Sequence, residues 1–303
     1  MMDTSHLQTV LAHDSTMRAA ADTLHAVAAQ GHGAEQGGES LFASLLRHLF
    51  DSHEVELPFL HFQLPQFSPV HVLGLTIDLS ITKHVVFLWA AALLLIALAL
   101  LAARSNTRRS VPRGWGNLVE VFIVFIRDEI ALPNMGPGGV KYLPYLLTTF
   151  FYILIMNLLG LVPYGASATG NVSVTGGLAF IAFLMIQWAA IRSQGMGHYL
   201  AHLTGGVHWA LWPIMIPIEI LGLFTKPFAL CIRLFANMTG GHIVLVSLIG
   251  LIFIFRSPLI AIAPASFAVG IMFLELFVAF LQAYIFTMLT SLFMGLGMKT
   301  NGH

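Results

Sequence analysis

Three stretches of the sequence are apolar over about the length that a helix needs to cross a bilayer. They are 85–103, 142–163, and 178–191 with a few preceding residues. A hydrocarbon core ~30 Å thick takes about 20 helical residues. The pattern therefore predicts three ordinary membrane-crossing helices.

A shorter apolar run at 114–130 has Trp115 near one edge and charged residues clustered at its ends. It is too short to span the membrane easily. We therefore predict an interfacial helix that lies along one membrane face.

Two further apolar segments are too long for an ordinary span. Pro213–Phe255 has 43 residues and Ala265–Met298 has 34. A helix over the first would be roughly 65 Å long, so it must break or lie strongly tilted. We predict an all-α polytopic membrane protein that ends in a hairpin of two long, strongly tilted helices (212–299), joined by a connection at 256–264.

Composition excludes a soluble globular domain, because charged residues make up 9% of the chain against roughly 25% in ordinary soluble domains. The mean hydropathy is +0.82. The formal net charge is zero, so the composition does not indicate a basic surface for nucleic-acid binding. The single cysteine, Cys231, excludes a disulfide framework, and we interpret it as a core residue. No basic segment followed by an apolar run opens the chain, so we expect no signal peptide.

Residues 1–82 have a different composition, with more than half of the 14 histidines, nine of the 14 acidic residues and only two Lys or Arg. We predict an extramembrane extension here, with an amphipathic helix over 7–27, a linker at 31–40 and an extended segment at 57–71. The histidines are irregularly spaced, which favours a solvated surface over a metal site. The membrane domain is then 83–300.

The distribution of arginines predicts the orientation. Four arginines lie within 104–113, which makes this loop and the adjacent interfacial helix cytoplasmic by the positive-inside rule. The loop 164–177 has no Lys or Arg, as expected on the outside. We therefore predict that the extension 1–82 is external and that the C-terminus is cytoplasmic.

The long hairpin carries polar residues that a lipid environment disfavours: Glu219, Lys226, Arg233, Asn237, His242, Glu275 and Gln282. The first four are spaced by seven, seven and four, which places them on one helical stripe. Arg233 is the strongest functional candidate, because a charge in mid-membrane costs ~2.5 kcal/mol or more and usually marks an ion or substrate path.

Folding the hairpin about its connection pairs these residues. Arg233 and Gln282 are equidistant from a point between Ser257 and Pro258, and His242 and Glu275 centre on nearly the same point. We therefore expect Arg233 to face Gln282 and His242 to face Glu275.

Other roles remain open for several of these polar residues. Asn237 and Gln282 suit structural hydrogen bonds between helices as well as a proton path. Lys226 has the reach to extend to the cytoplasmic edge, and Glu219 suits either that arrangement or a water path. Asn157, in the second predicted span, suits helix packing or an outer water path.

The strings RLFANM (233–238), GVHWALWPIMIPIEILGLFTKP (206–227) and FLQAYIFTMLTSLF (280–293) resemble subunit a of F-type ATP synthase. The likeness extends over about 85–300. It implies a hairpin that curves against a rotating ring of c subunits, in a complex with the b-subunit peripheral stalk, other synthase subunits and membrane lipid. It implies a bacterial inner membrane location and no cofactor or catalytic chemistry on this chain.

The resemblance also implies roles for individual residues. Arg233 matches the essential arginine that separates two half-channels. The outer half-channel matches Asn237, His242, Glu275 and Gln282, and the inner one matches Glu219. Many bacterial members carry the acid on the first hairpin helix and the His on the second, and here the two are exchanged. Protons are favoured over Na⁺, with the selecting residues expected on the c subunit.

Two other classes of protein are alternatives. A secondary transporter in which Arg233 binds an anionic solute requires internal repeats and broken helices, and no repeat is visible. A membrane metalloprotease requires an H-E-x-x-H motif, which the sequence lacks.

Overall fold

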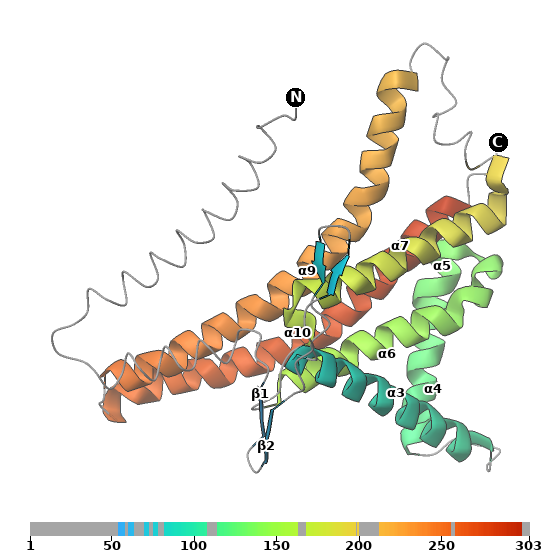
Figure 1. The fold of residues 1–303 in the computed structure, drawn as a ribbon. Helices are drawn as coiled ribbons and strands as arrows, with labels where there is room; N and C mark the ends of the chain where they lie inside the picture. Colours follow the sequence, from blue (N-terminus) through green and yellow to red (C-terminus); the bar gives the residue numbers. More distant parts are fainter. Residues whose placement is uncertain are drawn as a thin grey trace, which may run out of the picture. The chain divides into compact units, whose positions relative to one another are not determined.

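The protein is described by a computed structural model. The structure describes residues 54–57, 60–63, 70–72, 75–77, 82–107, 114–162, 168–197, 199, 212–255 and 258–298. The predicted amphipathic helix at 7–27 and linker at 31–40 lie outside these residues. Figure 1 shows that the described chain is dominated by helices.

Four short strands form two antiparallel hairpins within the segment that leads to the first long helix. Strand β1 (Glu54–Leu57) pairs with β2 (Leu60–Gln63), and β3 (Val70–Val72) pairs with β4 (Leu75–Ile77). Leu57 lies opposite Leu60, so two residues connect the first pair. The extended conformation predicted for 57–71 is confirmed for the parts of it that these strands cover.

The three ordinary spans are present as α3 (Lys83–Thr107), α6 (Leu143–Gly160) and α7 (Val172–Gln194). Helix α7 begins earlier than predicted, so the last part of the expected loop 164–177 is helical and this part of the prediction was wrong. The side chain of Asn171 caps the helix by accepting a hydrogen bond from the Ser173 backbone N–H at 2.8 Å, and a short 3-10 turn, η3 (Ala168–Gly170), precedes it. An Asn at this position is a typical start signal of a helix.

The short helix between α3 and α6 is also present. Helix α4 (Trp115–Phe125) continues through the π-helical η1 (Ile126–Ala131) into α5 (Leu132–Met135), and the 3-10 helix η2 (Pro137–Tyr142) leads on to α6. Among the described residues, α4, η1 and α5 are not part of any helix that is long and apolar enough to cross a membrane. Ile126 and Ile130 are fully buried, so this element anchors one face in the helix packing.

The C-terminal hairpin consists of α9 (Trp212–Phe255, 44 residues) and α10 (Pro258–Met298, 41 residues). The expected connection at 256–264 was wrong for most of its length, because α10 already begins at Pro258. Proline is well tolerated at the first position of a helix, where its missing N–H has no intrahelical partner anyway. Pro264 lies inside α10 and does not end it.

The chain divides into two compact units. One contains Leu245–Ala268, and the other contains Leu49–Val244 and Val269–His303. Every described residue that the sequence singled out for function belongs to the second, larger unit. Within it, α9 and α10 run side by side (Figure 1) and are joined by a side-chain hydrogen bond described below.

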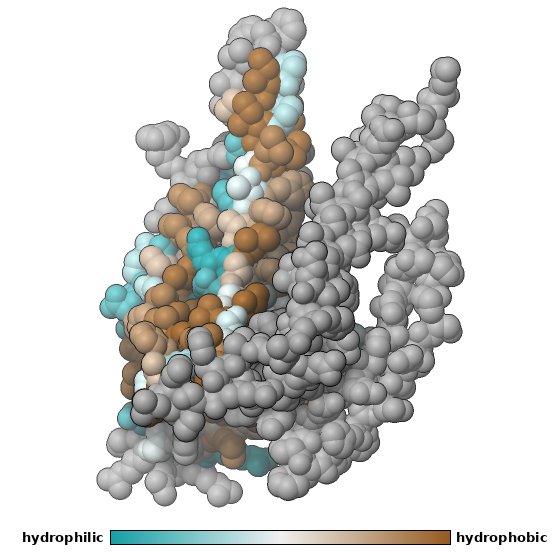
Figure 2. All heavy atoms as spheres, turned by 90° about the vertical axis from the view of Figure 1, so that its left-hand side faces the viewer, coloured by the Kyte–Doolittle hydropathy of each residue, from teal (hydrophilic) through white to brown (hydrophobic). Residues whose placement is uncertain are grey.

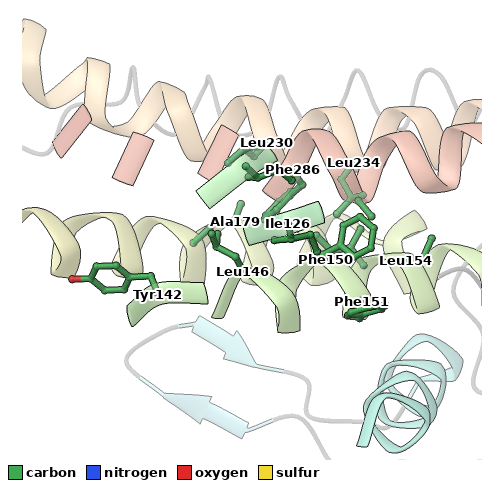
Figure 3. Packing of buried hydrophobic residues seen from close by; sticks show 14 of the residues in the cluster. Ile126, Tyr142, Leu146, Phe150, Phe151, Leu154, Ala179, Leu230, Leu234 and Phe286 are labelled. Carbon is green, nitrogen blue, oxygen red and sulfur yellow. The ribbon is translucent and has the colours of Figure 1, made fainter. Parts of the chain in front are cut away.

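The described helices bury a core and expose much apolar surface. Figure 3 shows Leu230 and Leu234 of α9 and Phe286 of α10 meeting Phe150 of α6 and Ile126 of η1. Among the residues that the structure describes, five helices are long and apolar enough to cross a membrane. Brown apolar side chains cover much of the described surface in Figure 2, with polar ones between them. This surface fits a multi-pass membrane protein, since lipid rather than water then covers the apolar side chains.

Candidate functional site

Arg233 is exposed on α9, next to Leu234, which is buried in the core. Within the described part of the chain, its guanidinium makes no hydrogen bond and no ion pair. A guanidinium carries five donors and is always charged, so Arg233 presents an uncompensated positive charge at the surface of the helix. Such a charge is available to a group outside this chain.

The residue that bonds to Gln282 is Asn237, one turn after Arg233. The Asn237 side-chain Nδ2 donates to Gln282 Oε1 at 2.9 Å. Asn237 itself is exposed, whereas Gln282 is only 4% exposed. The stripe from Arg233 to Asn237 therefore runs along the junction of the two hairpin helices.

A third helix contributes to this junction through Asn157 of α6, which is 2% exposed. Its Nδ2 donates to the backbone oxygen of Ala279 in α10 at 3.3 Å. Thr169 of η3 donates its hydroxyl to Asn157 Oδ1 at 2.8 Å. Buried amides need such partners, so Asn157 ties α6 and η3 to the hairpin.

A small cavity of about 20 Å³ lies at this junction. Its walls come from α6, α9 and α10: Asn157, Leu234, Asn237, Met238, Glu275, Val278, Ala279 and Gln282. A site of about 10–15 Å³ is enough for one water molecule when polar partners are present. The three amides and one carboxyl group in its walls supply such partners.

His242 and Glu275 are both partly buried, yet no hydrogen bond joins them. Within the residues described, His242 Nε2 and both carboxylate oxygens of Glu275 are buried without a hydrogen-bond partner. The Glu275 carboxyl group instead packs against Gly241, where an added Cβ would lie 3.0 Å from Glu275 Cδ. Leaving such groups unpaired costs about 1–3 kcal/mol each. The arrangement therefore suits groups that exchange protons or water rather than a fixed structural pair.

A second, larger cavity of about 240 Å³ lies at the other end of the stripe, among the ends of α7, α9 and α10. Its polar lining includes Glu219 and Lys226 of α9. The Lys226 ammonium group lies 5.4 Å from the centre of the Phe293 ring, in a cation–π contact. Glu219 and Lys226 thus share one polar cavity.

Three residues of this cavity were missed by the sequence reasoning: Gln187, Gln194 and Tyr199. The Tyr199 hydroxyl donates to Gln187 Oε1 at 2.6 Å, and Gln194 Nε2 donates to the backbone oxygen of Gly297. Burial, with a smaller effect of the Glu219 charge, raises the pKa of Tyr199 above its ordinary value. Gln187 was detectable as an amide inside a predicted span, whereas Tyr199 follows the span and carried no such signal.

The described residues contain no group of three or more His, Cys, Asp and Glu side chains that could hold a metal ion. The histidines at the start of the chain, for which the sequence favoured a solvated surface, lie before residue 82, where no side chain is described.

Comparison with known proteins gives consistent matches. Residues 85–295 match the family described as ATP synthase A chain. The chain is 51% identical over 296 residues to ATP synthase subunit a of Pelodictyon phaeoclathratiforme, covering 96% of this chain and 85% of that protein. It is 50% identical over 294 residues to ATP synthase subunit a 2 of Prosthecochloris aestuarii (95% and 89%). It is 54% identical over 229 residues to ATP synthase subunit a of Myxococcus xanthus (75% and 76%).

Proposed function

The chain belongs to the ATP synthase A chain family, and on this premise we propose how it acts as the proton-translocating stator of the membrane sector. In the proposal, α9 and α10 form a stationary wall against a ring of c subunits. Two offset aqueous half-channels in this wall connect the ring to opposite sides of the membrane. The hairpin provides no continuous pore, because an open pore would collapse the gradient.

The observation that carries the proposal is the position of Arg233 between two separate polar regions. Glu219 and the 240 Å³ cavity precede it on α9, and Glu219 is 14 residues, or about 21 Å, away along the helix. His242 follows it by nine residues, or about 13 Å. An exposed fixed charge thus separates a candidate outlet from a candidate inlet.

The inlet consists of His242 and Glu275 with the amides Asn157, Asn237 and Gln282. A proton that enters here neutralises a carboxylate on the ring. The neutral acid then tolerates lipid, since a protonated carboxyl group costs far less in hydrocarbon than a charged one. The ring turns and carries the proton away from the inlet.

At Arg233 the ring carboxylate loses its proton toward Glu219 and the second cavity. The guanidinium favours the charged form of the carboxylate. It remains protonated and does not relay a proton itself, so it also blocks a direct leak between the two half-channels. Each proton that crosses a potential of 100 mV supplies ~2.3 kcal/mol, and several protons per turn drive ATP synthesis in the complex.

The orientation follows from the charged loops. The segment 104–113 and the C-terminus lie in the cytoplasm, and the extension 1–82 and the hairpin connection lie outside a bacterial inner membrane. In this orientation protons enter past His242 and leave past Glu219. The partners are the c-ring, the b-subunit peripheral stalk and the surrounding lipid.

The test replaces Arg233 in the whole complex, reconstituted in vesicles. Arg233→Ala should abolish coupled ATP synthesis while leaving assembly largely intact. Arg233→Lys should also fail, because a lysine lacks the planar fork and can lose its proton when it is buried.

Arg192→Ala is the matched control, since Arg192 is an exposed arginine in the last turn of α7. It should retain ATP synthesis. Near wild-type ATP synthesis in the Arg233→Lys vesicles would refute the proposed role. The transporter alternative, in which Arg233 clamps an anionic solute, has no support from the family match.

A further inference from the structure

A glycine in the left-handed conformation ends α7. Gly195 ends the helix with a φ of 82°, a left-handed conformation that strongly favours glycine. Its N–H donates to the Ile191 oxygen at 2.8 Å, and the Tyr199 N–H donates to the Gly195 oxygen at 3.1 Å. Tyr199 therefore lies four residues beyond this glycine, in a helical conformation of its own.

The Tyr199 side chain is tied back to α7 by its hydroxyl group. It is half-buried and donates to Gln187 Oε1 at 2.6 Å. Gln187 lies seven residues, or about 10 Å, before Gln194 at the end of the helix. The hydrogen bond thus closes a loop of 12 residues between α7 and the segment that follows it.

Tyr199 and Gln187 both line the 240 Å³ cavity that contains Glu219. The cavity walls include Gln194 near the end of α7, Gly297 near the end of α10 and Glu219 two turns into α9. Tyr199 lies between the candidate spans Val172–Gln194 and Trp212–Ile252 in the sequence. Its hydroxyl group reaches back to Gln187, which lies inside the first of these spans.

We propose that Tyr199 is a further positioning residue of the proton path, which with Gln187 narrows the cavity beside Glu219 and limits access to Glu219. This inference rests on the proposed function only in assigning Glu219 to the outlet. The hydroxyl hydrogen is committed to Gln187, so the Tyr199 oxygen is left to accept hydrogen bonds from water in the cavity. The Tyr199 hydroxyl is protonated at neutral pH, because an ordinary tyrosine pKa is about 10 and burial raises it further.

The test measures the accessibility of the cavity directly, in vesicles that contain the whole complex. Leu223 lines the cavity and is replaced by cysteine in a Cys231→Ser background, and the rate of its reaction with a small charged thiol reagent is recorded. Tyr199→Phe removes the hydroxyl and keeps the ring. It should raise the reaction rate about two- to tenfold, the range that corresponds to one net hydrogen bond.

Gln187→Leu removes the other partner of the same hydrogen bond and should raise the rate to a similar extent. The double variant should react no faster than the faster single variant, because both changes break one bond. If the two single variants raised the reaction rate independently, so that their effects multiplied in the double variant, the proposal would be overturned. An unchanged rate in both single variants would also overturn it.

Ser193→Cys is the matched control, because Ser193 is exposed near the end of α7 and does not line the cavity. Its reaction rate should not respond to Tyr199→Phe. Gly195→Ala provides an independent route to the same result, since it strains the turn without a steric clash and should also speed the reaction of the cavity cysteine. ATP synthesis is measured in parallel, and its dependence on Arg233 is unaffected by either outcome. Failure of the proposed role of Tyr199 is therefore distinct from failure of the proposed function.

Discussion

Gly241 is the position where a single methyl group should most directly disturb the proposed inlet. An added Cβ would lie 3.0 Å from Glu275 Cδ and 3.1 Å from Glu275 Cγ, and nearer still to one carboxylate oxygen. Carbon atoms in favourable contact are about 3.5–4.0 Å apart. Gly241→Ala therefore forces the Glu275 carboxyl group out of its present position.

The magnitude divides into a stability part and a functional part. Overpacking of this kind costs about 1–3 kcal/mol, and replacing a helical glycine by alanine returns roughly 0.5–1 kcal/mol. The net loss of stability should be about 0–2.5 kcal/mol, which leaves the complex assembled. Proton flux should nevertheless fall about tenfold or more, because small displacements of reacting groups are severe for transfer steps.

The assay is passive proton flux through the reconstituted complex, driven by an imposed potential and read with a pH-sensitive dye. Gly222→Ala on the same helix is the control, since nothing lies within 4 Å of a Cβ there, and it should retain its flux. Glu275→Asp shortens the acid by one methylene group, so it should restore part of the flux lost in Gly241→Ala. Undiminished flux in Gly241→Ala, or no recovery in the double variant, would refute the steric reasoning.

Three further predictions concern the inlet, the orientation and the packing. Glu275→Gln should slow proton uptake severely because an amide does not titrate, and full flux in this variant would remove the acid from the path. His242→Ala should have a milder effect if water fills the gap. Exchanging the two residues should recover part of the flux lost in His242→Glu. Cysteines introduced at Ser40 and Ser105 should react with an impermeant reagent from opposite sides of the membrane, and reaction from the same side would reverse inlet and outlet. Asn157→Ala should lower the free energy of unfolding by about 1–3 kcal/mol, because it leaves the Thr169 hydroxyl and the Ala279 carbonyl group without their partner, and an unchanged thermal unfolding midpoint would contradict this packing role.

The hairpin illustrates both the success and the limit of pattern reasoning. The apolar run Pro213–Phe255 matches α9 almost residue for residue, because its few polar residues are isolated and no run of them marks a loop. The predicted connection 256–264 was too long, because α10 already begins at Pro258 and continues through Pro264.

The pairing of residues across the hairpin shows the same limit at finer scale. Symmetric folding about one point predicted Arg233 opposite Gln282, whereas Asn237 forms the bond, one turn away. Counting residues ignores how two helices slide past each other until their side chains interlock. That offset is set by packing and is not encoded in the spacing of either helix alone.

The sequence by itself determined the class of protein, the helices, their approximate ends and the polar residues that lipid disfavours, because each depends on local composition and on the thickness of the bilayer. Only the tertiary structure decided which of these residues share a cavity. Glu219 and Tyr199 are brought to one cavity by three helices from distant parts of the chain, and the amide of Asn157 reaches α10 across 122 residues of sequence. Such neighbourhoods depend on the relative placement of helices, which results from the sum of many weak packing contacts and leaves no periodic signal in the sequence.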